Sequence, residues 1–274
     1  MMTSNLKIFL TAILLLSPGF LFSQEIITDR PDKTESVETV GKNRFQLETG
    51  MEYASIKYDN VPALIDTNFV GTISFKSKTL TVPTTLLRYG ILKNVELRFG
   101  FDFDRTTLSS DDVEFDNSGG LTLNPPTLGA KYEVAKGKGI VPDFSILGSV
   151  KIPNVGDEFK QVKHFTPELV FLFSNEINDK FGVGYNIGVE WSDDLEERNY
   201  FYSVSLGMGI TPRLGAFAEF FGDLKTDVKN SNQNIDGGFT YLIKNNIQVD
   251  IYGGLGLTEE ANNFMLGTGI AFKF

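Results

Sequence analysis

The chain of 274 residues carries 35 acidic and 25 basic side chains, a formal net charge of −10, and this acidic balance argues against nucleic acid as a partner. It holds no cysteine, which excludes disulfides, thiolate metal sites and cysteine nucleophiles. The mean hydropathy is −0.07, and no segment approaches the roughly 18 apolar residues of a membrane-spanning helix.

The first residues predict a signal peptide over residues 1–23. Lys7 precedes an apolar run, Ile8 to Leu16, that has the length of a signal-peptide core and is too short to cross a bilayer as a helix. A proline and a glycine end the run, and the small Ser23 precedes the expected cleavage point. The alternative interpretation is an uncleaved membrane anchor.

Residues 24–43 form an extension before the first predicted strand. Its charges are concentrated in a short stretch that holds Asp29, Arg30, Asp32, Lys33 and Glu35. One interpretation is a plug in the lumen, or a latch on the periplasmic side, of the barrel that follows. The other is a disordered periplasmic leader, which the polar composition alone would allow. The plug domain of a TonB-dependent transporter would be far longer.

Alternation of apolar and polar residues recurs from Arg44 to the end of the chain. It is clearest over Val95–Asp104, where Glu96, Arg98 and Asp102 lie on the face opposite the apolar residues. In a membrane barrel the apolar face meets lipid and the polar face lines the lumen. Twelve strands are predicted, near residues 44–57, 79–90, 95–104, 125–134, 141–152, 166–174, 181–191, 199–210, 214–222, 235–243, 247–256 and 264–274. We therefore predict an all-β fold, a transmembrane antiparallel up-and-down β-barrel over residues 44–274.

The predicted connections alternate in length. Short turns such as Ile91–Asn94 and Lys244–Asn246 alternate with long polar loops such as Tyr58–Lys78 and Arg105–Asn124. Bacterial barrels have short periplasmic turns and longer extracellular loops, and an even strand number brings both termini to the periplasm. Aromatic residues near the strand ends favour the two bilayer interfaces. We predict a bacterial outer-membrane protein with both termini periplasmic.

The last predicted strand, Phe264–Phe274, ends on its aromatic residue. Its apolar face alternates with a face that carries Gly267, Gly269 and Lys273. An unpaired apolar edge of this kind invites aggregation in water, whereas in a barrel it pairs with the first strand. The ending resembles the C-terminal signal of bacterial outer-membrane proteins, which implies that the barrel-assembly machinery recognises Phe274.

Two stretches of sequence resemble one family. The residues T-D-R-P-D-K-T-E-S, Thr28 to Ser36, followed by F-Q-L-E-T-G-M-E-Y, Phe45 to Tyr53, resemble the outer-membrane proteins of the meta-pathway phenol-degradation, or "transporter", family. Leu86 to Gly100 resembles the second hairpin of that family. The likeness covers essentially the whole chain after the signal peptide. It implies an outer-membrane β-barrel that passes small hydrophobic or aromatic compounds, and it implies no catalytic residue.

Charged residues on the predicted lumen face form the candidate site. Because charges shielded from water must be matched, Arg30 is expected to pair with glutamates of the lumen, and the nearby aspartates with its arginines. The candidate binding residues are Asp29, Arg30, Asp32, Glu48, Glu52, Arg88, Glu96, Arg98 and Asp102. The expected partners of Arg30 are Glu48, Glu52 and Glu96; those of Asp29 and Asp32 are Arg88 and Arg98. Other lumen-facing charges are Lys131, Lys151, Glu168, Glu190, Glu219, Asp236, Asp250 and Lys273.

Acids outnumber bases in this set, so an open lumen favours cations or neutral solutes over anions. Alternatively, the charges pair off and close a narrow barrel. Eight strands fill their interior and sixteen leave a channel, so twelve strands leave both interpretations open.

Two acidic loops and one histidine are the other polar groups of chemical interest. The acidic loops Asp111–Asp116 and Asp193–Glu197 offer hard oxygens to a divalent ion, but they lack the spacing of an EF-hand and fit a solvated surface. His164 is the only histidine, and no serine or aspartate can be placed beside it from the sequence. We predict no metal site, no cofactor and no enzyme.

The function expected from the sequence is passive transport of small hydrophobic or aromatic solutes. The expected partners are outer-membrane lipid, lipopolysaccharide, the barrel-assembly machinery and the solute. One alternative is a non-transporting outer-membrane structural or interaction protein. A second is a membrane-embedded hydrolase that uses His164.

Overall fold

The computed structural model describes residues 26–66, 69–110, 113–117, 120–158, 160–225, 231–259, 261 and 263–274. The predicted signal peptide lies outside these ranges. Among the residues they cover, no helix is long and apolar enough to cross a bilayer.

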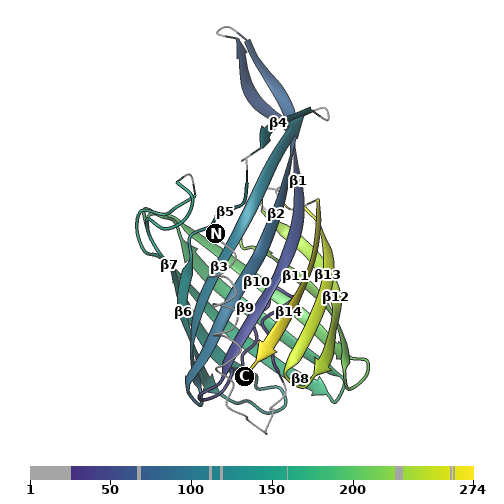
Figure 1. Cartoon of the computed structure of the whole chain (residues 1–274). Helices are drawn as coiled ribbons and strands as arrows, with labels where there is room; N and C mark the ends of the chain where they lie inside the picture. The colour runs from purple at the N-terminus through teal and green to yellow at the C-terminus, as the bar shows by residue number, and fades with distance from the viewer. Residues whose placement is uncertain are drawn as a thin grey trace, which may run out of the picture.

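All secondary-structure elements of the described residues are β-strands (Figure 1). These are β1 (Phe45–Asp66), β2 (Phe69–Leu92), β3 (Val95–Ser110), β4 (Val113–Asn117), β5 (Thr122–Leu123), β6 (Thr127–Ala135), β7 (Asp143–Lys151), β8 (Thr166–Asn178), β9 (Phe181–Trp191), β10 (Arg198–Gly209), β11 (Leu214–Asp223), β12 (Gln233–Lys244), β13 (Ile247–Gly256) and β14 (Phe264–Lys273). The short β4 and β5 pair with β3. The other twelve strands of the described chain close one antiparallel barrel, in which β3 pairs directly with β6 and β1 with β14. The prediction of a twelve-stranded antiparallel barrel is confirmed.

The first and last strands close the barrel. Their register runs from Gln46 opposite Lys273 to Ser55 opposite Phe264. The N–H of Phe274 donates to the carbonyl of Phe45 at 2.8 Å, and the two rings lie 6.0 Å apart between centroids. The edge that the last strand would otherwise expose is therefore paired along its length.

The first hairpin is longer than the sequence predicted. Strands β1 and β2 contain 22 and 24 residues, whereas about 9–11 tilted residues cross a bilayer. The region expected to be a loop, Tyr58–Lys78, pairs across the hairpin, and the rings of Tyr58 and Phe75 stack 4.8 Å apart. That loop prediction was wrong because each strand satisfies the backbone of the other beyond the barrel. Figure 1 shows the hairpin rising above the barrel wall.

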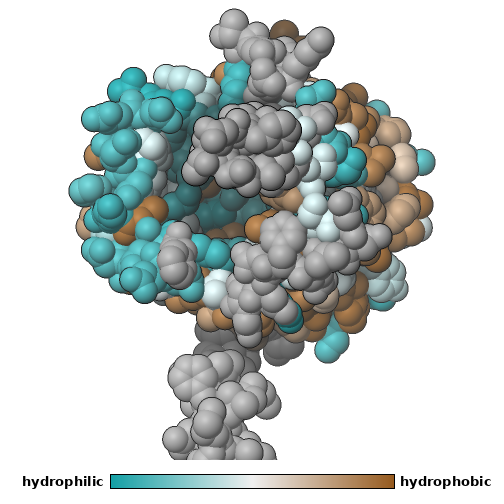
Figure 2. Space-filling view, turned by 90° about the horizontal axis from the view of Figure 1, so that it is seen from above, coloured by the Kyte–Doolittle hydropathy of each residue, from teal (hydrophilic) through white to brown (hydrophobic). Residues whose placement is uncertain are grey.

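The two faces of the barrel wall differ in polarity. On β13, Gln248, Asp250 and Tyr252 point inward and are buried, whereas Ile251 points outward and is 54% exposed. Outward apolar side chains recur on other strands: Leu97, Leu128, Ile187, Leu206, Phe239 and Leu266. A belt of this size would be unfavourable in water, so it faces lipid. Seen from the end with the long loops, hydrophilic residues surround a hollow (Figure 2).

A small apolar cluster lies inside the barrel. Leu147 of β7 and Val170 and Leu172 of β8 point into the lumen and pack with Val37, which belongs to the segment before β1. Phe201 of β10 packs against this cluster. The chain before the first strand therefore contributes to the core of the molecule.

Candidate functional site: a charged segment inside the barrel

Residues 26–40, here called the lumenal segment, enter and leave the lumen at the end that carries the short turns. The N–H of Ile26 donates to the carbonyl of Asn245 at 2.8 Å, and the hydroxyl of Thr39 donates to the carbonyl of Lys93 at 3.0 Å. Between these points the segment has no helix and no strand. It is held by side chains of the barrel wall.

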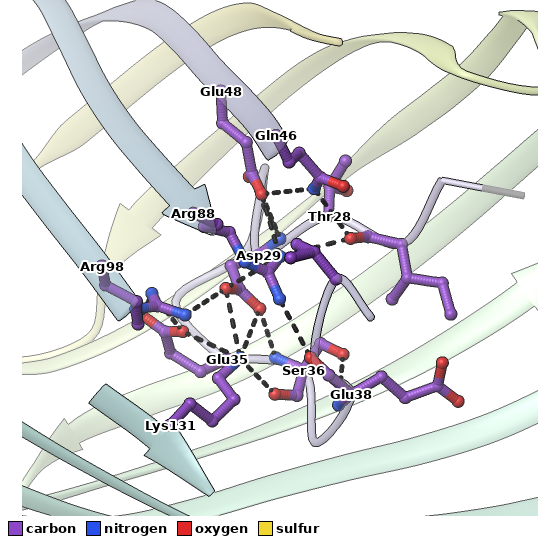
Figure 3. A network of polar contacts seen from close by, with 12 residues as sticks. Thr28, Asp29, Glu35, Ser36, Glu38, Gln46, Glu48, Arg88, Arg98 and Lys131 are labelled. Carbon is purple, nitrogen blue, oxygen red and sulfur yellow. Dashed lines mark hydrogen bonds and ion pairs between the residues drawn. The ribbon is translucent and has the colours of Figure 1, made fainter. Parts of the chain in front are cut away.

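Asp29 lies at the centre of a network of ion pairs (Figure 3). Its carboxylate is 2.5 Å from Arg98 Nη1, 3.1 Å from Arg88 Nη1 and 3.1 Å from Lys131 Nζ. Burial alone would raise the pKa of Asp29, but Arg88, Lys131 and Arg98 together hold that pKa well below its usual value. Asp29 is therefore a buried carboxylate that three cations keep ionised.

The same cations are shared with glutamates of the wall. Arg88 donates to Glu96 at 2.9 Å and to Glu48 at 3.0 Å, and all three side chains are buried. Glu48 in turn accepts from the backbone N–H groups of Asp29 and Arg30, each at 3.1 Å. Strands β1, β2, β3 and β6 thus form one charged receptor for the turn at Asp29.

Arg30 points toward the closing strands. Its guanidinium donates through Nη2 to Asp250 at 3.1 Å and through Nη1 to Thr84 at 3.1 Å. It lies over Gly50 and Gly269, where a Cβ atom would come within 2.6 Å and 2.3 Å of it. The ion-pair partner of Arg30 is therefore Asp250, whereas Glu48, Glu52 or Glu96 is expected from the sequence.

The next residues contact acidic groups on the opposite wall. Glu219 of β11 accepts from the N–H of Lys33 at 2.7 Å and from the hydroxyl of Thr34 at 2.5 Å. Burial, and then the charge of Glu219, raise the pKa of Asp32 well above its usual value. Asp32 therefore lies on this acidic side of the lumen, and not beside Arg88 or Arg98 as expected.

Two more carboxylates belong to this acidic side. Asp236 of β12 stands opposite Glu219 in the register, and among the described residues its buried carboxylate oxygens have no hydrogen-bond partner. Glu52 accepts from Lys33 Nζ at 3.2 Å and from the hydroxyl of Tyr252 at 2.5 Å. Lys33 thus brings one positive charge to a carboxylate-rich wall.

Glu35, Ser36 and Val37 lie between the charged receptor and the apolar cluster. Glu35 accepts two hydrogen bonds from Arg98 Nη2, at 2.8 and 2.7 Å. The N–H of Ser36 donates to Asp29 at 2.9 Å, and the carbonyl of Val37 accepts from Ser145 at 2.5 Å. These three residues are therefore fixed by contacts of several kinds.

Cavities border the lumenal segment on both sides. A cavity of about 480 Å³, the inner cavity, lies between the segment and strands β8 to β10 and reaches the short turn at Asp179. A cavity of about 180 Å³, the outer cavity, is lined by Arg98, Leu147 and Glu190 and lies nearer the long loops. A third, of about 200 Å³, is lined by Arg30 and Asp102. The segment thus divides the lumen without filling it.

Four groups that hold the lumenal segment lie outside the candidate set predicted from the sequence. Lys131, Glu219 and Asp250 were recognised as lumen-facing, but alternation gives no depth or partner and could not rank them. Glu35 was visible as one of the clustered charges, but the Arg98 that it contacts is far away in the chain. Asp102 accepts from the amide of Asn124 at 2.9 Å, and the structure gives it no bond to the lumenal segment.

Two long loops meet at His164. Its Nδ1 lies 3.0 Å from the carbonyl of Asp193, whose carboxylate accepts from the backbone N–H groups of Lys163 and His164. The fold thus places beside His164 an aspartate that the sequence could not place there. In the other acidic loop, Asp111 and Asp112 lie outside the described residues. Among the residues that are described, no group of three or more metal-ligating side chains could hold a metal ion.

Comparisons with known proteins give a family and distant structural neighbours. The family described as "Putative MetA-pathway of phenol degradation" matches residues 28–274. The CymD monoaromatic hydrocarbon channel is 12% identical with a TM-score of 0.46, covering 85% of this chain and 88% of its own. The translocator domain of the autotransporter NalP from Neisseria meningitidis is 12% identical with a TM-score of 0.48, covering 85% and 89%. The toluene transporter TbuX from Ralstonia pickettii is 10% identical with a TM-score of 0.47, covering 85% and 89%. No curated protein of similar sequence was found.

Proposed function

The chain belongs to this phenol-degradation family, and on that premise we propose that it is a passive outer-membrane channel for small aromatic solutes. The observation that carries the proposal is the division of the lumen into cavities on either side of the lumenal segment. The segment is held by side chains and pairs with no strand. It can therefore move without breaking the barrel wall.

The lining of the lumen supports a solute that is aromatic and weakly polar. The inner cavity, at about 480 Å³, has the size of small-molecule sites in proteins. It is bordered by Ile27, Val37 and Phe181 and also by Ser205 and Glu35. A ring with a hydroxyl group, such as a phenol, can contact the apolar members and donate to the polar ones.

A non-transporting barrel is the second candidate function. The observation that favours it is the charged receptor around Asp29, which is buried and closes the lumen beside β1, β2, β3 and β6. If the segment never leaves its place, the extracellular loops would be the functional part.

Ion current through the full chain in a planar lipid bilayer separates the two functions. A channel should conduct, and added phenol should interrupt the current in proportion to its concentration, whereas glycerol should not. A variant without residues Thr28–Glu35 should conduct more than the wild type because the segment no longer divides the lumen. A variant that folds and still passes no current would contradict transport.

The placement of the chain in the membrane completes the proposal. Both termini are periplasmic, because the short turns and the closing pair Phe45–Phe274 lie at the same end. The long loops then face the lipopolysaccharide side. The barrel-assembly machinery engages the last strand through Phe274, whose ring is 55% exposed on the outer face.

A further inference from the structure

The lumen has two unlike sides. Strands β1, β2, β3, β6 and β13 carry the charged groups that hold Asp29 and Arg30. Strands β7 to β10 instead present Leu147, Val170, Leu172 and Phe201 together with serines and glycines, and they carry Lys151, Glu168 and Glu190 nearer the long loops. The inner cavity lies along this second side, and the outer cavity lies where the two sides meet, between Arg98 of β3 and Glu190 of β9.

Glycines leave open space on the wall of the inner cavity. A Cβ atom on Gly182, Gly207 or Gly209 would have no heavy atom nearer than 3.7 Å, and the nearest atom is in each case a backbone oxygen. By contrast, a Cβ atom on Gly269 would enter the guanidinium of Arg30. The free volume of the lumen is therefore concentrated beside β9 and β10.

One stretch of the lumenal segment separates the two cavities. Glu35 lines both of them, and Val37 covers Leu172, which is completely buried. The contacts that hold this stretch come from Arg98, Lys131 and Ser145. Moving it would join the cavities over an apolar surface.

We propose that solutes cross the barrel along β7 to β10, over the Leu147–Val170–Leu172–Phe201 surface, and that Glu35–Val37 closes this path. The proposal rests on the function proposed above and names its route. Aromatic rings bury a large apolar area and pack on other rings, so the surface with Phe201 recognises the ring. The serines of β10 and the carboxylate of Glu35 accept the hydroxyl hydrogen.

The route is tested by filling the inner cavity. Gly207→Trp places an indole in the open space beside β10, whereas Gly148→Trp places the same group on the lipid face of β7, where a Cβ atom has no neighbour within 4 Å. Both variants should fold, as shown by heat-modifiable migration on gels. Gly207→Trp should lose the ion current and its interruption by phenol, and Gly148→Trp should keep both.

The closing stretch is tested with a matched pair of acids. Glu35→Ala removes the side chain that accepts two hydrogen bonds from Arg98, and Glu38→Ala removes one that lies 3.6 Å from Lys136 at the short turns. The current should rise for Glu35→Ala and stay at the wild-type level for Glu38→Ala.

The outcomes distinguish the route from the function. If wild type and all variants pass no current, the proposed function is wrong and the route with it. If wild type conducts and Gly207→Trp conducts equally, the solute uses another path and only the route is overturned. Equal currents for Glu35→Ala and Glu38→Ala would overturn the assignment of Glu35–Val37 as the closure.

Discussion

The guanidinium of Arg30 lies over the backbone of Gly269, where a Cβ atom would come within 2.3 Å of Arg30 Nε. All the nearest atoms to that Cβ position belong to Arg30. Position 269 therefore holds no side chain because Arg30 occupies the space.

Gly269→Ala should displace Arg30 from Asp250 and raise the ion current, as Arg30→Ala should. The control is Gly253→Ala on the outer face, where the nearest atom to the added Cβ is 3.4 Å away. Planar-bilayer recordings of the three variants make the comparison. A current for Gly269→Ala equal to that of Gly253→Ala would show that Arg30 does not hold the lumenal segment in place.

Arg88→Gln should destabilise the folded barrel by about 3–5 kcal/mol, because Asp29, Glu48 and Glu96 would lose their shared buried cation. Lys136→Gln is the control, since Lys136 is half exposed and its ion pairs at the turn contribute about 0–1 kcal/mol. Urea unfolding in lipid vesicles measures both. Similar losses in the two variants would mean that the Asp29 network is not desolvated.

The current should rise as the pH increases from about 5 to about 8. Burial, opposed by Arg98 and Lys131 and assisted by Asp29, raises the pKa of Glu35 from 4.5 to about 7. Burial and the charges of Glu219 and Asp236, opposed by a hydrogen bond with Ser205, also raise the pKa of Asp32. Both carboxyl groups bind their proton more tightly when the segment is docked, so this docking energy is complete below about pH 4, and the part that Glu35 contributes is lost as the pH rises through about 7.

Recordings of Glu35→Gln check that dependence. The variant should show a weaker rise than the wild type, because a glutamine does not titrate and only Asp32 remains. The lowered pKa of Asp29 has the opposite effect on docking, which weakens as this carboxylate takes up its proton. That protonation occurs only below the usual pKa of an aspartate. A current that falls between pH 5 and pH 8 would contradict the assignment.

Ile251→Arg should cost about 2–4 kcal/mol of folding free energy, because this outward side chain lies midway along β13 in the lipid. Gly207→Arg places the same charge in the open lumen and should cost much less. Unfolding in urea with lipid vesicles gives both values. Equal costs would invalidate the assignment of the two faces.

Deleting Phe274 should leave the chain unfolded in the periplasm. The deletion removes two backbone hydrogen bonds to Phe45 and the terminal ring. Phe274→Tyr keeps the ring and should assemble normally. The yield of heat-modifiable protein in outer-membrane fractions is measured for the deletion and for Phe274→Tyr. A normal yield after the deletion would show that Phe274 is not needed for assembly.

The strand arrangement could be predicted because it depends on alternation, which is local in the sequence. Val95–Asp104 and Ile247–Gly256 each show which side chains meet lipid, and the structure agrees. The long hairpin was missed because Asp59, Asn60 and Pro62 are residues typical of a turn, although Thr72–Lys76 alternates. Pairing there depends on the partner strand, which a pattern within one strand does not describe.

The candidate site was predictable in its composition but not in its pairing. Opposite charges were visible in the segment and in the lumen, yet Arg30 pairs with Asp250 and Asp32 lies near Glu219. These partners are set by strand order around the barrel and by depth along it. The space over Gly269 that admits Arg30 comes from two strands lying side by side, so no single stretch of sequence contains it.

The groups that receive the lumenal segment come from opposite ends of the strand order, with Glu48 on β1 and Asp250 on β13. They come together around Arg30 only after β1 has joined β14 and sealed the wall. The lumenal segment, which precedes β1 in the chain, is thus among the last parts of the molecule to reach its folded position. Until then their charges stay hydrated and their backbone is open to proteases. Resistance of residues 26–40 to cleavage therefore marks a barrel that has completed its assembly.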